Sequence, residues 1–231
     1  MAVSSTPPDA VLIQAGTVEL QGLLRKPRGA SAVVLFAHGS GSGRLSPRNS
    51  FVAERLREAG LCTLLFDLLT EEEEQLDALT AELRFNISLL TARLAAASEW
   101  ALRTPQLRGL ALAYFGASTG AAAALAAAAE IPQVTAVVSR GGRPDLAGPA
   151  LPRVRAATLL IVGGDDPQVL ALNQQAIGKL RCEAQLAVVP GATHLFVEPG
   201  ALERVASLAA AWFARHARVS EPAPPTRRGA E

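Results

Sequence analysis

The sequence contains few residues of the kinds on which several protein classes depend. Only Lys26 and Lys179 are lysines, and 22 basic against 21 acidic residues leave a net charge of +1. This balance excludes the basic surface that is typical of nucleic-acid-binding proteins. Cys62 and Cys182 are the only cysteines. Two cysteines make neither a disulfide framework nor a metal-binding motif, so we expect two buried free thiols.

No segment indicates a membrane span or an export signal. Residues 1–10 lack the basic and apolar regions of a signal peptide, and the apolar run 120–129 is too short to cross a bilayer. We therefore expect a cytoplasmic protein with no membrane partner. The sequence leaves the oligomeric state open, a homodimer included.

What the sequence does have is a regular alternation of strand-like and helix-like segments. A chain of 231 residues, 49% of them hydrophobic, suits one domain, which we place at residues 1–218. The proline-containing tail, 219–231, is expected to be disordered. A hairpin (11–14 and 17–24) precedes buried-strand candidates at 32–37, 61–66, 109–115, 134–138, 157–162 and 184–189. Helix candidates are 47–60, 76–102 with one break, 119–130, 168–181 and 201–217.

This alternation predicts a doubly wound α/β fold with a mostly parallel sheet, because parallel strands need crossover connections. The strand candidates are apolar throughout, as expected of strands that helices cover on both faces. Residues 139–156 are expected to form a loop, and no insertion is large enough for a cap domain. A fairly open site should therefore lie beyond the carboxyl ends of the strands.

The pattern Gly116-Ala117-Ser118-Thr119-Gly120 lies between an apolar strand candidate and a helix candidate. In this context G-x-S-x-G forms a turn so tight that the serine backbone is strained and flanking side chains would clash. The pattern alone is weak, and its placement gives it weight. The alternative is a small-residue turn that only lets helix and sheet pack closely. We expect Ser118 to be a nucleophile.

A serine hydroxyl needs a base, and the chain has three histidines. His194 follows the last strand candidate and precedes the last helix, which places it at the same edge of the sheet as Ser118. His216 lies among arginines in the last helix, where a surface role is expected. His38 precedes a glycine-rich loop and is given a structural role. His194 is therefore the expected base.

The acid that orients the histidine should follow the penultimate strand, where Asp165 and Asp166 stand side by side. Asp166 is preferred because it lies on the turn, three residues past Gly163. Asp145, after the preceding strand, is a third candidate. The order serine, aspartate, histidine is the order found in α/β hydrolases.

The loop 38–43 alternates glycine with small polar residues after the first parallel strand. Hydrolysis through a tetrahedral intermediate needs backbone N–H groups directed at the developing oxyanion. We expect these donors to be the N–H groups of Ser40 and Thr119. The loop lacks the Gly-Lys-Ser/Thr ending of a phosphate-binding P-loop, which argues against nucleotide binding.

Four arginines are expected at the same edge of the sheet: Arg44, Arg48, Arg140 and Arg143. Paired guanidinium groups suit a substrate carboxylate, and we single out Arg44 and Arg140 for that role. The alternative is that they form ion pairs with Asp145, Asp67 or the glutamate run 71–74.

Together these residues resemble the α/β-hydrolase superfamily over residues 11–217. Within it, the chain is similar to cap-less proteins related to dienelactone hydrolase. The similar segments are HGSGSGRLSPRN from His38, FGASTGAAAA from Phe115, VSRGGRPDLAG from Val138, LLIVGGDD from Leu159 and GATHLF from Gly191. The resemblance implies a Ser–Asp–His triad, an eight-stranded sheet with one antiparallel strand, and no metal or organic cofactor.

One position departs from the resemblance. Dienelactone hydrolases proper use a cysteine nucleophile, whereas position 118 is serine, and a hydroxyl is activated differently from a thiolate. The sequence therefore predicts a serine esterase that cleaves small-molecule carboxylic esters. A thioesterase, an amidase or a perhydrolase would use the same residues. The alternative from another class is a non-catalytic binding module on a hydrolase scaffold.

Overall fold

The computed structural model describes residues 9–219, so the tail expected to be disordered (219–231) lies outside the described residues except for Val219. Eight strands form one sheet. They are β1 (Asp9–Ala15), β2 (Val18–Arg25), β3 (Ala32–Ala37), β4 (Cys62–Phe66), β5 (Ala111–Ala117), β6 (Val134–Arg140), β7 (Ala157–Gly163) and β8 (Ala184–Val189). The helices are α1 (Pro47–Glu58), α2 (Glu71–Thr80), α3 (Ile87–Arg103), α4 (Thr119–Glu130), α5 (Pro167–Ile177) and α6 (Ala201–His216).

The order of strands across the sheet is β1-β2-β4-β3-β5-β6-β7-β8. Strand β2 runs antiparallel to both of its neighbours, β1 and β4. Every other neighbouring pair is parallel. The mostly parallel α/β sheet, the N-terminal hairpin and the single antiparallel strand are therefore confirmed.

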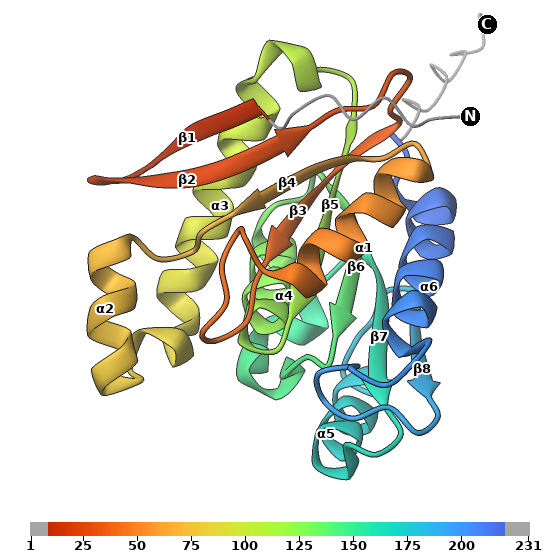
Figure 1. Cartoon of the computed structure of the whole chain (residues 1–231). Helices are drawn as coiled ribbons and strands as arrows, with labels where there is room; N and C mark the ends of the chain where they lie inside the picture. The colour runs from red at the N-terminus through yellow and green to blue at the C-terminus, as the bar shows by residue number, and fades with distance from the viewer. Residues whose placement is uncertain (1–8, 220–231) are drawn as a thin grey trace, which may run out of the picture.

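Helices cover both faces of the sheet (Figure 1). On one face, α3 and α4 pack against side chains such as Leu112 and Tyr114 of β5. On the other face, α1 and α6 pack against Ala113 and Phe115 of the same strand. Successive residues of a strand point to opposite faces, so β5 supplies both hydrophobic cores. No helix within residues 9–219 is long and apolar enough to cross a membrane.

The break expected within residues 76–102 lies between α2 and α3. A 3-10 turn, η1 (Leu83–Phe85), occupies it, and α2 ends at Ala81 with a left-handed backbone (φ 58°). A capping box begins α2: the Thr70 hydroxyl accepts from the N–H of Glu73, whose carboxylate accepts from the N–H of Thr70. The glutamate run 71–74 therefore begins a helix, as its favourable position in the helix dipole predicts.

Several expectations about burial and boundaries were wrong. Strand β8 is partly exposed because it is the last strand of the sheet, with only β7 beside it. Strand β5 begins two residues later than expected, and α5 ends four residues earlier than expected.

The remaining differences concern Cys182 and the segment 139–156. Within residues 9–219 both cysteines are free, but only Cys62 is fully buried, and burial raises the pKa of its thiol to about 12. The segment expected to be a loop contains 3-10 turns between Pro144 and Arg153, interrupted at Gly148. Within residues 9–219 no cap domain covers the carboxyl edge of the sheet.

Candidate active site

Ser118 stands on a tight turn between β5 and α4. Its φ of 51° and ψ of −122° are unfavourable for a residue with a side chain, so the turn holds the serine in a strained conformation. Its backbone N–H donates to the carbonyl of Arg140 (3.3 Å), and its carbonyl accepts from the N–H of Arg143 (3.1 Å). The end of β6 and the loop that follows it therefore fix the backbone of Ser118 on both sides.

The two glycines of the motif are required by contacts between backbones. A Cβ atom at Gly116 would lie 2.5 Å from Cα of Ala121, and one at Gly120 would lie 2.3 Å from the carbonyl oxygens of Ala37 and His38. Neither site leaves room for a methyl group without moving a strand or a helix. The spacing of G-x-S-x-G is thus explained by how closely α4 approaches the sheet.

His194 and Asp166 are joined at the same edge of the sheet. Nδ1 of His194 lies 2.7 Å from Oδ2 of Asp166, which begins α5 directly after β7. The Asp166 side chain is 14% exposed and the His194 side chain 39% exposed. A carboxylate on Nδ1 fixes the tautomer that carries its proton there, which leaves Nε2 as the nitrogen able to accept a proton.

The other two candidate acids are placed differently. Arg143 holds Asp145 in a two-pronged ion pair, with N···O distances of 2.9 and 2.7 Å. Asp165 is exposed, and its backbone N–H donates to the carbonyl of Ala192. Of the three aspartates, the structure therefore brings only Asp166 to the histidine.

Gly141 brings the histidine loop close to the serine turn. This residue follows β6 with a φ of 51°, and a Cβ atom there would lie 3.4 Å from Cε1 of the His194 ring. Since the preceding residue, Arg140, accepts from the N–H of Ser118, the two loops meet at the end of β6. Within residues 9–219 no hydrogen bond joins the Ser118 and His194 side chains, a contact that often forms only with substrate bound.

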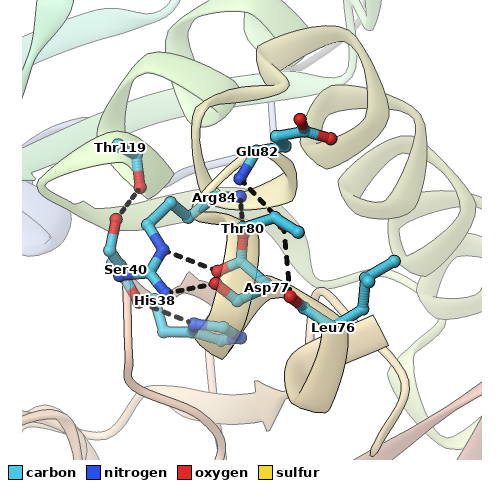
Figure 2. Close-up of polar contacts among 9 residues, drawn as sticks. His38, Ser40, Leu76, Asp77, Thr80, Glu82, Arg84 and Thr119 are labelled. Carbon is cyan, nitrogen blue, oxygen red and sulfur yellow. Dashed lines mark hydrogen bonds and ion pairs between the residues drawn. The ribbon is translucent and has the colours of Figure 1, made fainter. Parts of the chain in front are cut away.

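The glycine loop after β3 lies directly against Ser118. A Cβ atom at Gly39 would come within 2.9 Å of Cβ of Ser118. The hydroxyls of Ser40 and Thr119 are 3.3 Å apart, so the two residues expected to supply oxyanion donors are neighbours (Figure 2). Thr119 is also the first residue of α4, whose N–H has no partner within the helix.

Both ring nitrogens of His38 are occupied by the backbone. Nε2 accepts from the N–H of Leu68 (2.9 Å), so Nδ1 carries the proton and donates to the carbonyl of Gly39 (3.0 Å). Burial is the main cause that lowers the pKa of this histidine, which keeps it neutral. The third histidine, His216, lies at the end of α6 and stacks on Trp212.

A cavity of about 190 Å³ opens beside Ser40 and Thr119. Its other wall was not expected from the sequence: it comes from α2 and η1, where Arg84 binds Asp77 through Nε (2.6 Å) and through its backbone N–H (2.9 Å) (Figure 2). The rest of the lining includes the apolar side chains of Leu68, Leu69, Ala78 and Leu90 and the carboxylate of Glu74. No signal in the sequence pairs Asp77 with Arg84 across the break.

The four arginines divide into two pairs. Arg44 forms an ion pair with Asp67 and also donates to the side chain of Gln21 (2.6 Å), and Arg143 is held by Asp145. Ion pairing therefore accounts for these two arginines. Arg48 and Arg140 have no ion pair or side-chain hydrogen bond among residues 9–219. A carboxylate-binding role for Arg44 together with Arg140 stays a prediction.

Among residues 9–219 no three histidine, cysteine or acidic side chains are grouped as metal ligands would be. The polar groups of the site are instead a hydroxyl, an imidazole, a carboxylate and backbone N–H groups. This is the set of groups that acyl transfer requires.

Comparison with known proteins gives the family. The sequence model of the dienelactone hydrolase family matches residues 20–218. The crystal structure of a dienelactone hydrolase from Anabaena variabilis is 55% identical in sequence, covers 92% of this chain and 100% of its own, and has a TM-score of 0.89. A dienelactone-hydrolase-like promiscuous phosphotriesterase from metagenomic libraries is 21% identical over 90% of this chain and 97% of its own. Its TM-score of 0.73 shows a shared fold.

Two proteins from strains of Mycobacterium tuberculosis, named as candidate phosphoribosyl transferases, are 55% identical to this chain over 210 residues. Those residues are 90% of this chain and 46% of each relative, so the chain spans about half the length of the curated relatives it matches. The family match over residues 20–218 shows that this chain belongs to the dienelactone hydrolase family.

Proposed function

We propose that this chain is a carboxylic-ester hydrolase that works by acyl transfer through Ser118. The observation that carries the proposal is the 2.7 Å contact between His194 and Asp166, at the edge of the sheet where Ser118 lies. Membership of a hydrolase family supports the reaction type. The strained turn at Ser118 supports the role of this residue as nucleophile, because such a turn between strand and helix presents the hydroxyl beyond the sheet.

In this mechanism Oγ of Ser118 attacks the ester carbonyl while Nε2 of His194 takes the hydroxyl proton. Asp166 holds the imidazole in the required tautomer and stabilises the imidazolium that forms. The N–H groups of Ser40 and Thr119 stabilise the oxyanion of the tetrahedral intermediate. His194 then donates its proton to the leaving alcohol. Water next attacks the acyl-enzyme and gives a proton to His194, which returns it to Oγ of Ser118 as the acid leaves.

The cavity beside Ser40 and Thr119 supports a small substrate. Its volume of about 190 Å³ and its apolar lining suit a short acyl chain rather than a polymer. Serine in place of cysteine favours a general carboxylesterase over a dienelactone hydrolase. The cytoplasmic location and a homodimer stay predictions from the sequence.

The test is hydrolysis of p-nitrophenyl butyrate by the wild-type protein and by Ser118→Ala. We expect the substitution to lower kcat by about 10⁴-fold or more, since a nucleophile cannot be replaced by its neighbours. Ser88→Ala, at an exposed position of α3, is the matched control and should retain full activity. Undiminished activity in Ser118→Ala would rule out the mechanism.

The same residues would serve a thioesterase, an amidase or a perhydrolase. Rates on an ester, a thioester and an amide with the same butyryl group separate the first two from an esterase, and peroxide as acyl acceptor tests the third. A binding module would not react at all. A fluorophosphonate that fails to add its mass at Ser118 in the folded protein would favour the binding module.

The name of the mycobacterial relatives suggests a second activity, phosphoribosyl transfer. We infer that this name describes the part of those proteins that the present chain does not cover, because the shared 210 residues include the region that matches the hydrolase family. The loop 38–43 also lacks the ending of a P-loop. Release of pyrophosphate from phosphoribosyl diphosphate in the presence of a nucleobase would contradict this inference.

A further inference from the structure

Arg140 is a buried cation without a counter-ion. The residue is only 8% exposed, and its Nη1 atom is buried with no hydrogen-bond partner among residues 9–219. A buried charge left without a partner costs several kcal/mol, so buried arginines are normally paired with a carboxylate or a ligand. Burial first, and then the charge of Arg48, lower the pKa of Arg140 to about 10, which leaves it protonated at neutral pH.

The side chain of Arg140 lies on the face of the sheet that α1 covers. Ala136 and Val138 of β6 pack in the same core as Val52 and Leu56 of α1, and strand residues alternate between faces. Arg140 is therefore directed to the face of the sheet that α1 and α6 cover, at the carboxyl end of the strand. The backbone carbonyl of Arg140 accepts a hydrogen bond from the N–H of Ser118. Arg140 therefore lies next to the proposed nucleophile.

Arg48 supplies a second cation at the amino end of α1. Its Nε atom is buried and has no partner within residues 9–219, and the residue lines a depression of about 380 Å³. The first turn of this 12-residue helix contains no acidic side chain. Asn49, the next residue, is fully buried, and its Oδ1 atom also has no hydrogen-bond partner. Arg48 and Arg140 thus each have a buried N–H donor without an acceptor, whereas the unpaired atom of Asn49 is itself an acceptor.

Two carboxylates border the depression that Arg48 lines. Asp67 is already bound by Arg44, which neutralises it. Glu74 belongs to α2, and burial and the nearby carboxylates of Asp67 and Asp77 raise its pKa. Neither acid forms an ion pair with Arg48 or Arg140. Within residues 9–219, therefore, no carboxylate neutralises Arg48 or Arg140.

We propose that Arg48 and Arg140, together with the amino end of α1, bind a phosphate group. Two guanidinium groups and a helix N-terminus match the two negative charges of a phosphate monoester, whereas one carboxylate would neutralise only half of the pair. Arginine also offers the two-pronged donors that phosphate oxygens accept. The phosphate comes either from the acyl part of an ester bound at Ser118 or from a separate small molecule.

The test measures binding of inorganic phosphate and of phenyl phosphate to Ser118→Ala, so that hydrolysis plays no part in the result. Calorimetric titration should show saturable binding. We expect Arg140→Met or Arg48→Gln to weaken it by about tenfold or more, the loss expected for charge-assisted hydrogen bonds. The control is Arg155→Gln, which removes one exposed positive charge just before β7, at the opposite end of the sheet. Its affinity should stay within about twofold of Ser118→Ala alone.

A second readout separates a ligand-binding arginine from a structural one. Without phosphate, Arg140→Met should leave the Tm unchanged or raise it, because the substitution removes an unpaired buried charge. Phosphate should then raise the Tm of Ser118→Ala but not that of Arg140→Met. Arg48→Gln provides the same comparison at a less buried position. The proposal would be overturned if phosphate did not bind saturably, or if Arg140→Met and Arg48→Gln bound it as tightly as Ser118→Ala alone.

Hydrolysis of two esters by the active enzyme shows whether the phosphate is part of the substrate or of a separate molecule. The p-nitrophenyl esters of butyrate and of 4-phosphonooxybutyrate differ only in the phosphate group. If the substrate carries the phosphate, kcat/KM is higher for the second ester, and Arg140→Met abolishes that preference. If phosphate binds in the titration while the two esters react equally, the site takes a separate phosphate-bearing molecule.

Discussion

The cavity beside Ser40 has two walls that are built in different ways. One wall is the start of α4, where backbone atoms of helix and strand approach each other so closely that Gly116 and Gly120 have no room for a methyl group. The other wall is α2 with η1, which exposes Leu76 and Leu79 and is held by the pair Asp77–Arg84. Close packing makes the first wall intolerant of change, whereas polar contacts hold the second.

Gly120→Ala should have the largest effect, because a Cβ atom at position 120 meets the carbonyl oxygens of Ala37 and His38 at 2.3 Å. The helix would have to move away from β3, and we expect a loss of about 3 kcal/mol or more in the free energy of unfolding. Urea denaturation measures it. The matched control is Gly178→Ala at the end of α5, where the nearest atom is 3.7 Å away. Similar losses for both glycines would remove the basis of the comparison.

The next largest loss of stability is expected from a buried hydrogen bond between β5, the strand that precedes Ser118, and α3. The hydroxyls of Tyr114 in β5 and Ser98 in α3 are 2.6 Å apart, and both residues are fully buried. Ser98→Ala leaves the tyrosine hydroxyl unpaired, so we expect a loss of about 1–3 kcal/mol in the free energy of unfolding.

The double variant Tyr114→Phe with Ser98→Ala removes both partners of that bond. It should be less destabilised than the sum of the two single variants, because no buried hydroxyl is then left without a partner. Denaturation of all four proteins completes the cycle. If the losses in the free energy of unfolding of the two single variants simply added in the double variant, this contact would not contribute to stability.

The wall formed by the start of α4, here called the elbow wall, could be predicted from the sequence because the residues that form it are adjacent in the chain. Five consecutive residues contain the turn, the proposed nucleophile and both glycines, and the flanking segments are recognisable by composition alone. The histidine and its acid followed from their order along the chain and their positions after strands. The preference for Asp166 over Asp165 and Asp145 agrees with the contact to His194.

The contacts of the other wall and those of the arginines could not be predicted, because they join segments whose relative placement the sequence does not reveal. Asp67 and Arg44 come from different loops, and the sequence offered several acids as partners for each arginine. The pair Asp77–Arg84 spans a helix break whose geometry depends on the left-handed residue Ala81. The unpaired state of Arg140 depends on which side chains the covering helices place over the end of β6.

Asp77→Asn tests the wall formed by α2 and η1, which the pair Asp77–Arg84 holds. Burial works to raise the pKa of Asp77, but the N–H groups and the charge of Arg84 outweigh it and hold that pKa below its ordinary value. A lowered pKa in the folded state adds stability above the ordinary value of about 4, and this stability is lost as the pH falls through the folded pKa. We expect the variant to lose about 1–2 kcal/mol at pH 7 and less at pH 3.

Denaturation of the wild type and of Asp77→Asn across that pH range measures the difference. Asp9→Asn, at an exposed position at the start of β1, is the control and should show no such convergence. A constant difference between wild type and Asp77→Asn from pH 3 to pH 7 would show that the wall does not depend on this ion pair.

The smallest effect is expected on the outer surface of α2. Leu79 is 86% exposed and lies outside both hydrophobic cores, so Leu79→Ser removes little apolar contact. We expect the free energy of unfolding to change by no more than about 0.5 kcal/mol, as is usual for surface substitutions. Leu125→Ser, in the buried part of α4, is the counterpart in the elbow wall and should be strongly destabilised. If Leu79→Ser were as destabilising as Leu125→Ser, α2 would have to be packed against something in solution, and the two walls would no longer differ in construction.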